Sequence, residues 1–149
     1  MQKFDKPLLK SQTWAFKALE MRFTMYQTKI KGDKLYHSVS EGYGKSVELF
    51  GFPKDGETPM SLVNIALASC VTMCIQGYFA RFHQETVVAS VVDSTYDEGH
   101  FKLLVGIAHV LDNTMREEIL AYVDEQCRVK KMLRDDLTYE ISLGENDDF

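Results

Sequence analysis

The stretch from Met60 to about Phe82 constrains the fold more than any other part of the sequence. No proline interrupts it, and Gly77 is its one glycine. Thr58 and Pro59, directly before it, are residue types preferred at an N-cap and at the first helical position. Apolar side chains occur nearly all round the expected helix, which is typical of a buried helix. We therefore expect one long central helix with the rest of the chain packed around it.

Alternating apolar and polar residues predict strands on both sides of this helix. In the first of them Leu19, Met21, Phe23 and Met25 share one face. The turn residues 31–34 and 97–99 each separate two such segments, which is typical of hairpins. The expected strands are 15–30, 35–40 and 46–50 before the helix, and 86–96, 101–110 and 137–143 after it.

A second helix is expected to open at Asn113-Thr114, where Thr114 and Glu117 have the spacing of a capping box. Its apolar positions fall four apart and lead to Cys127, which we expect on the same inward face. The element order is then β-β-β-α-β-β-α-β. Strands grouped in hairpins favour an α+β fold, here one domain over residues 1–149 with residues 1–14 as a loose arm.

Composition and charge argue against several classes of partner. The formal net charge is −5, whereas nucleic-acid binding needs clustered positive charge. The most apolar segment, 62–75, is too short to span a membrane, and the N-terminus lacks the pattern of a signal peptide. Three cysteines are too few for a secreted disulfide framework. We expect a cytoplasmic protein with neither a nucleic-acid nor a membrane partner.

The cysteines are the residues most able to carry chemistry. A free cysteine is often simply a buried apolar residue, and Cys70 needs a second group to act with. Cys127 is its natural partner, because one thiolate can form a sulfenic acid and the other can condense to a disulfide. Cys74, one turn after Cys70, is poorly placed for a disulfide with it and is expected to be core. The cysteines and four histidines show no metal-binding motif, so no metal or bound cofactor is expected.

Two segments resemble motifs of the OsmC/Ohr family. Thr58-Pro59-Met60-Ser61-Leu62, leading into Ala66-Leu67-Ala68-Ser69-Cys70, resembles the motif of its first helix. Cys127-Arg128-Val129, followed by Leu133, resembles the motif of its second helix. The resemblance covers residues from about 16 to the end.

This resemblance implies an intertwined homodimer in which antiparallel sheets from both chains wrap two central helices. It also implies thiol-dependent reduction of hydroperoxides, organic ones especially, as part of an oxidative-stress response. Cys70 would be the peroxidatic thiol and Cys127 the resolving thiol. An external dithiol would recycle the disulfide.

Activation of Cys70 requires a nearby cation, because only a thiolate attacks peroxide. In peroxidase members of the family, an arginine from the N-terminal sheet plays this part, held by a glutamate at the helix start. Arg22 is the positional match for the arginine, although a solvent-facing charge is an equal alternative. The glutamate position holds Met60 and Ser61, with Glu57 just upstream.

Two other functions remain open from the sequence. One is a non-catalytic OsmC-like dimer that binds a small apolar ligand near Cys70, with methionines lining the pocket. The methionines in question are Met21, Met25, Met60 and Met73. The other is a redox sensor whose disulfide changes its contacts with a partner.

Overall fold

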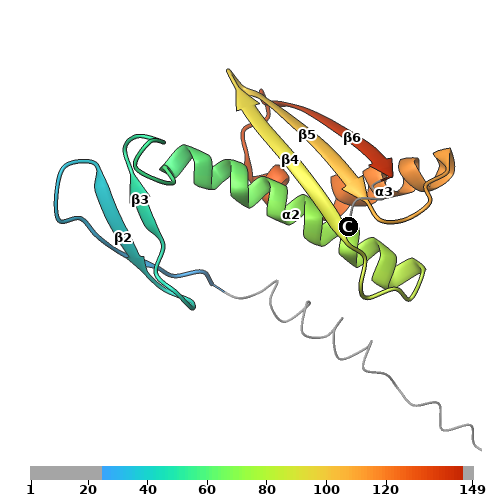
Figure 1. Cartoon of the computed structure of the whole chain (residues 1–149), viewed down its shortest axis with the longest axis horizontal. Helices are drawn as coiled ribbons and strands as arrows, with labels where there is room; N and C mark the ends of the chain where they lie inside the picture. Colours follow the sequence, from blue (N-terminus) through green and yellow to red (C-terminus); the bar gives the residue numbers. More distant parts are fainter. Residues whose placement is uncertain (1–24, 146–149) are drawn as a thin grey trace, which may run out of the picture. The chain divides into compact units, whose positions relative to one another are not determined.

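The computed structural model describes residues 25–145, which include two small sheets and three helices (Figure 1). The chain divides after residue 49 into two compact units, each treated by itself below. The expected arm over residues 1–14 lies outside the described residues, as does most of the expected strand over 15–30.

The first unit is built on a three-stranded sheet in the order β1-β2-β3. Its strands are β1 (Lys29–Lys31), β2 (His37–Glu41) and β3 (Glu48–Phe50). β1 and β2 pair in antiparallel fashion, as expected from the turn between them. The His37 side chain contacts the carboxylates of Asp33 and Glu48, so it ties that turn to the third strand.

The second unit begins with the helix expected from the sequence, α2 (Pro59–Phe82). Thr58 is its N-cap, and the Ser61 N–H donates to the Thr58 hydroxyl at 3.1 Å. The Thr58 N–H in turn donates to the Ser61 hydroxyl at 2.7 Å, which completes a capping box with serine in the third position. The predicted helix start is therefore confirmed.

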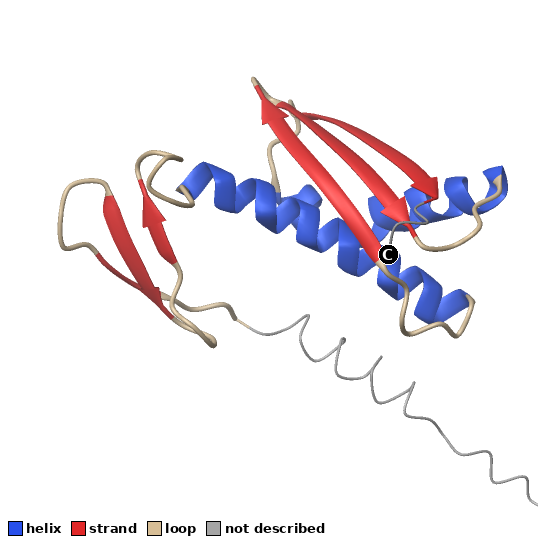
Figure 2. Cartoon of the chain, viewed as in Figure 1, coloured by secondary structure: helices blue, strands red, loops and turns tan. Residues whose placement is uncertain are grey.

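A three-stranded sheet in the order β4-β5-β6 lies along one side of α2 (Figure 2). β4 (Ser90–Asp97) and β5 (His100–Ile107) form the expected antiparallel hairpin. β6 (Thr138–Glu145), however, runs parallel to β5, so the expectation of purely antiparallel sheets is wrong for this strand. The reason is the connection, because the chain returns through two helices to the beginning of β5 before β6 starts.

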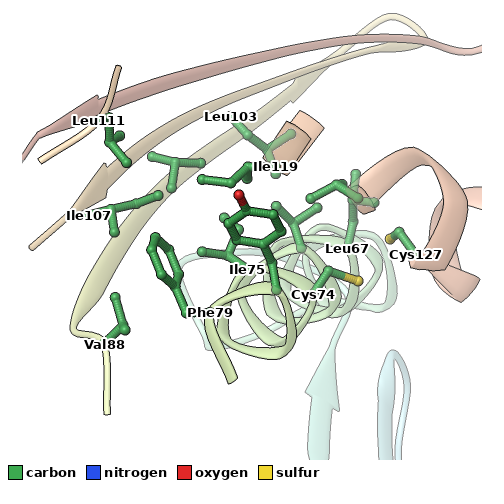
Figure 3. Close-up of a cluster of buried hydrophobic side chains, with 14 of the residues drawn as sticks. Leu67, Cys74, Ile75, Phe79, Val88, Leu103, Ile107, Leu111, Ile119 and Cys127 are labelled. Atoms are coloured by element: carbon green, nitrogen blue, oxygen red, sulfur yellow. The ribbon is translucent and has the colours of Figure 1, made fainter. Parts of the chain in front are cut away.

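The core of the second unit lies between this sheet and the helices (Figure 3). One face of β5 is buried as its alternation predicted, and the inward side of α2 packs against it. The buried residues of these two elements are Leu67, Val71, Cys74, Ile75, Tyr78, Phe79, Phe101, Leu103, Val105 and Ile107. The expected α+β fold with a central apolar helix is thus observed.

Burial of α2 on every side is not observed within the single chain. Met60, Ile65, Met73 and Phe82 are exposed, because the one sheet covers only one side of the helix. Among the described helices, α2 alone has the length and hydropathy that a membrane span requires, and central helices of globular cores meet the same criterion. Its 24 residues exceed the apolar segment 62–75 recognised in the sequence.

The second long helix, α3 (Asn113–Gln126), opens at Asn113 as expected, but its N-cap lies two residues before Thr114, the predicted cap. Its N-cap is Asp112, whose carboxylate accepts the Met115 N–H at 2.7 Å. Thr114 therefore lies inside the first turn, and its predicted capping role is wrong. The physical reason is that Asp112 has extended backbone and a side chain that accepts well at this position.

This correction gives a direct test by paired substitution. We expect Asp112→Ala to lower the free energy of unfolding by about 1 kcal/mol, since it removes the capping acceptor. The matched change Thr114→Ala should leave stability unchanged or slightly raise it, because alanine is the better helix former. Urea denaturation of both variants measures the difference. Equal losses, or a larger loss for Thr114→Ala, would contradict the observed cap.

Candidate functional site: a cluster of three thiols

Three cysteines meet where α2 approaches the connection between the last two helices. Cys70 and Cys74 lie one turn apart on α2 and therefore share a face of that helix. Cys127 comes from the junction between α3 and α4 (Arg128–Met132). The three sulfur atoms all lie within 4.8 Å of one another. Figure 3 shows the sulfurs of Cys74 and Cys127 facing each other between the two elements.

Cys127 occupies a break in the helical chain and not a helix face as the sequence predicted. Its backbone is extended, with φ −71° and ψ 101°. Its N–H donates to the Val123 carbonyl at 2.8 Å and so closes α3, while its carbonyl accepts the Lys131 N–H at 3.2 Å and so opens α4. This placement puts the Cys127 sulfur beside the first turn of α4, where the backbone N–H groups of Lys130 and Val129 help to lower the pKa of its thiol.

Burial differs among the three thiols. Cys127 is fully buried, Cys74 is 8% exposed, and Cys70 is only partly buried. All three belong to, or pack against, the apolar core cluster of the second unit. Within one chain, Cys70 is therefore the thiol that a molecule arriving from solvent reaches first.

The hydrogen bonds in the cluster favour a negative charge on Cys127. The Cys74 thiol donates to its sulfur, and this bond is the main cause that lowers the pKa of Cys127 to about 6. The N–H of Lys130 and the thiol of Cys70 add to the effect, whereas burial opposes it. The pKa of Cys74 is raised, first by its hydrogen bond to Cys127 and then by burial. Burial likewise raises the pKa of Cys70.

The cluster changes two interpretations of the sequence. Cys74 is buried as expected, but it is also a full member of the thiol site. The sequence shows no metal-binding motif, yet the three cysteine side chains converge to within 4.8 Å in the fold. The membership of Cys74 in the site could have been inferred from its four-residue spacing from Cys70, since that spacing places both thiols on one helix face.

The remaining predicted site residues fall partly outside the described range. Arg22 and Met21 lie outside the described residues. Met60 and Met73 are exposed on α2, and Met25 is exposed in the first unit.

The first turn of α2 is held by polar contacts of its own. Ser61, at the position expected for the family glutamate, takes part in the capping box, and its hydroxyl donates to the Glu57 carboxylate. Within the described residues, Ser61 and Glu57 therefore stabilise the N-terminus of α2.

A shallow depression also opens beside α4 and β6, with a volume of about 470 Å³. Its lining is largely charged, and none of the three cysteines contributes to it. The lining residues are Asp124, Lys130, Lys131, Leu133, Arg134, Asp135, Leu137 and Tyr139. Because it contains neither a thiol nor an enclosed apolar surface, we place the chemistry at the thiol cluster.

Comparison with known proteins identifies the fold. The structure is similar to the OsmC-like protein of Mycoplasma pneumoniae, with a TM-score of 0.66 at 14% identity over 83% of this chain and 98% of that one. It is similar to the OsmC-like protein of unknown function from Vibrio cholerae, with a TM-score of 0.61 at 11% identity. That match covers 80% of this chain and 100% of the Vibrio protein. It is also similar to the organic hydroperoxide resistance protein OhrB of Bacillus subtilis, with a TM-score of 0.56 at 18% identity. That match covers 81% of this chain and 98% of the Bacillus protein.

No protein-family model matches the chain. No curated protein sequence matches it either. The structural similarities therefore show the fold, and they agree with the resemblance carried by the two cysteine motifs.

The charge on Cys127 predicts a pH dependence of stability. Its folded pKa of about 6 lies below the value of about 8.5 for an ordinary thiol in an unfolded chain. Between these pH values the unfolded state binds more protons, so the free energy of unfolding of the reduced protein should rise with pH. The contribution should be complete above the unfolded pKa and lost as pH falls through the folded one.

Denaturation of wild type and Cys127→Ser at pH 5.5 to 9, an interval chosen to bracket both values, measures this effect. The difference between the two proteins should grow with pH from about 6 to about 8, where the thiols of Cys70 and Cys74 stay protonated in the folded and unfolded states of both proteins. Parallel curves would show that Cys127 carries no such charge.

Proposed function

We propose that this chain, which has the OsmC-like fold, reduces organic hydroperoxides with Cys70 as the peroxidatic thiol and Cys127 as the resolving thiol. The observation that carries the proposal is the close approach of the two sulfurs, within 4.8 Å, from two segments far apart in sequence. The naming of one structural neighbour as an organic hydroperoxide resistance protein supports the substrate class.

The first chemical step uses the difference in burial between the two thiols. Cys70 is the more accessible, and its thiol donates a hydrogen bond to the Cys127 sulfur. As Cys70 attacks the outer peroxide oxygen, Cys127 accepts its proton. The O–O bond breaks and Cys70 becomes a sulfenic acid, while the alkoxide takes the proton from Cys127 and leaves as an alcohol, so that Cys127 is again a thiolate. Cys127 thus acts as the base for Cys70 before it acts as the resolving thiol.

The second step forms the disulfide. Cys127 attacks the sulfenic sulfur of Cys70, an S–S bond forms, and water leaves. The two sulfurs already lie within 4.8 Å, so their side chains need to approach by less than about 3 Å to reach the S–S bond length of about 2.05 Å. An external dithiol then reduces the bond by exchange, so no bound cofactor is needed.

Arg22 is proposed to assist the attack. A guanidinium close to the Cys70 sulfur would stabilise its thiolate against the burial that raises its pKa.

We further propose that the active form is a homodimer in the cytoplasm. The exposed apolar side of α2 supports this, because a second copy would cover a helix that the sheet of one chain leaves half open. The apolar residues concerned are Met60, Ile65, Met73 and Phe82.

One equivalent of cumene hydroperoxide added to the reduced protein tests the reaction. We expect rapid loss of two free thiols per chain and a Cys70–Cys127 disulfide in peptide mass mapping. Cys70→Ser should reduce peroxide no faster than free cysteine does. Cys127→Ser, which lacks both the base and the resolving thiol, should form more slowly a sulfenic acid on Cys70 that dimedone traps, and Arg22→Ala should slow the first step.

Cys74→Ser is the matched control, because it removes a neighbouring thiol that the mechanism does not require for the disulfide. It should retain the Cys70–Cys127 disulfide and multiple turnovers with excess dithiol. If instead Cys74→Ser abolishes turnover while Cys70→Ser does not, the assigned roles are wrong. If all three thiols of the wild type stay reduced, the peroxidase function itself is excluded.

The dimer is tested by a charge placed on the open side of α2. Met73 is 67% exposed in the single chain, so Met73→Lys should leave the fold intact and weaken association by about tenfold or more. Val87, 91% exposed and outside the helix, supplies the control Val87→Lys, which should remain dimeric. Sedimentation equilibrium distinguishes the forms. A monomeric wild type, or equal behaviour of both variants, would exclude this interface.

A further inference from the structure

We propose that the reduced thiols of Cys70, Cys74 and Cys127 also form a binding site for a trivalent thiophilic ion, with arsenite as the soluble probe. The proposal does not depend on peroxide reduction. It rests on the convergence of three thiols, from two separate segments, on one point in an apolar core.

The spacing of the sulfurs suits one ion bound by all three. Trivalent arsenic keeps a lone pair and binds three thiolates as a pyramid, so metal–sulfur bonds of about 2.3 Å place the sulfurs about 3.4 Å apart. The three sulfurs here already lie within 4.8 Å of one another. Contraction by no more than about 1.4 Å per pair therefore completes the site.

The two elements differ in how freely they can adjust. Cys70 and Cys74 are fixed on consecutive turns of α2, where they present two ligands on one face. Cys127 lies on the extended junction between α3 and α4. A rigid pair and an adjustable third ligand can close around an ion without unwinding either long helix.

Charge selects a trivalent ion over the more familiar divalent ones. Three thiolates and one trivalent ion form a neutral complex, whereas three thiolates and Zn²⁺ carry a net negative charge. An unpaired charge is costly to bury among apolar side chains. Zinc also prefers four ligands, and among the described residues no histidine, aspartate or glutamate joins the three cysteines. Both arguments favour a three-coordinate, neutral complex.

The binding reaction needs no oxidant or reductant. Arsenous acid, As(OH)₃, exchanges its three hydroxyls for three thiolates. Three As–O and three S–H bonds break, three As–S bonds form, and three water molecules leave. Cys70, the most accessible thiol, would be the first ligand and Cys127, fully buried, would complete the site.

The site exists only in the reduced protein. A disulfide between any two of the cysteines removes two of the three ligands, and a bound ion holds the thiols that peroxide would oxidise. Ion binding and disulfide formation therefore exclude each other, whichever pair becomes oxidised.

Native mass spectrometry of the reduced full chain with one equivalent of arsenite is the primary test. We expect one arsenic per chain with the loss of three protons, together with the disappearance of all three free thiols. A complex that has lost only two protons and retains a hydroxyl would show a two-thiol site and overturn the proposal. Absence of binding would overturn it as well. These readouts need no variant and no peroxide, so the result is independent of the peroxidase test.

Variants then assign the ligands. Each single change Cys70→Ser, Cys74→Ser and Cys127→Ser should weaken binding by about 100-fold or more, since partners outside the ligand set alone contribute 10–100-fold. Cys74→Ala provides a second variant at the buried position should serine perturb folding. Wild-type affinity in the Cys74 variants would exclude it as a ligand. Competition with Zn²⁺ should displace little arsenite, and full displacement would contradict the argument from charge.

Discussion

The packing of α2 against the sheet β4-β5-β6 is the interaction on which the rest of the structure depends. It buries the apolar face of β5 and the inward side of the helix in one cluster. Removal of this apolar area from water is the main favourable contribution to folding at such a site. The same packing fixes the face of α2 that carries Cys70 and Cys74, so the position of the thiols follows from the core and requires no separate support.

The chemistry of the site depends on an interruption of regular structure. If α3 continued through Cys127, the backbone N–H groups of the residues after Cys127 would all form hydrogen bonds within the helix. Because the chain is extended there, the Cys127 sulfur lies beside the Cys74 thiol and the backbone N–H groups at the start of α4, which together lower the pKa of Cys127. The neighbouring thiols thus acquire different acidities within one apolar environment. In the proposed mechanism, that difference lets Cys127 serve as the base while Cys70 reacts.

Much of the fold could be predicted from the sequence. The start of α2 followed from Thr58 and Pro59, and the buried face of β5 from its alternation. The parallel pairing of β6 could not, since an alternating pattern specifies a strand but not its neighbour or direction. Nor could the break at Cys127, because the four-residue apolar spacing runs up to Cys127 without interruption. At the site, the two motif cysteines were identifiable, whereas the participation of Cys74 depended on where Cys127 lies in space.

The parallel strand has a consequence for how the molecule acquires its reactive centre. β6 joins β5 only after the intervening segment of α3 and α4 has crossed over, so this pairing links residues distant in sequence. Contacts of that kind carry a large loop-closure entropy and tend to form late in folding. Cys127 lies within the crossover itself. A nascent or partly folded chain would therefore hold Cys70 and Cys74 without their partner, and the order of folding would delay thiol chemistry until the fold is complete.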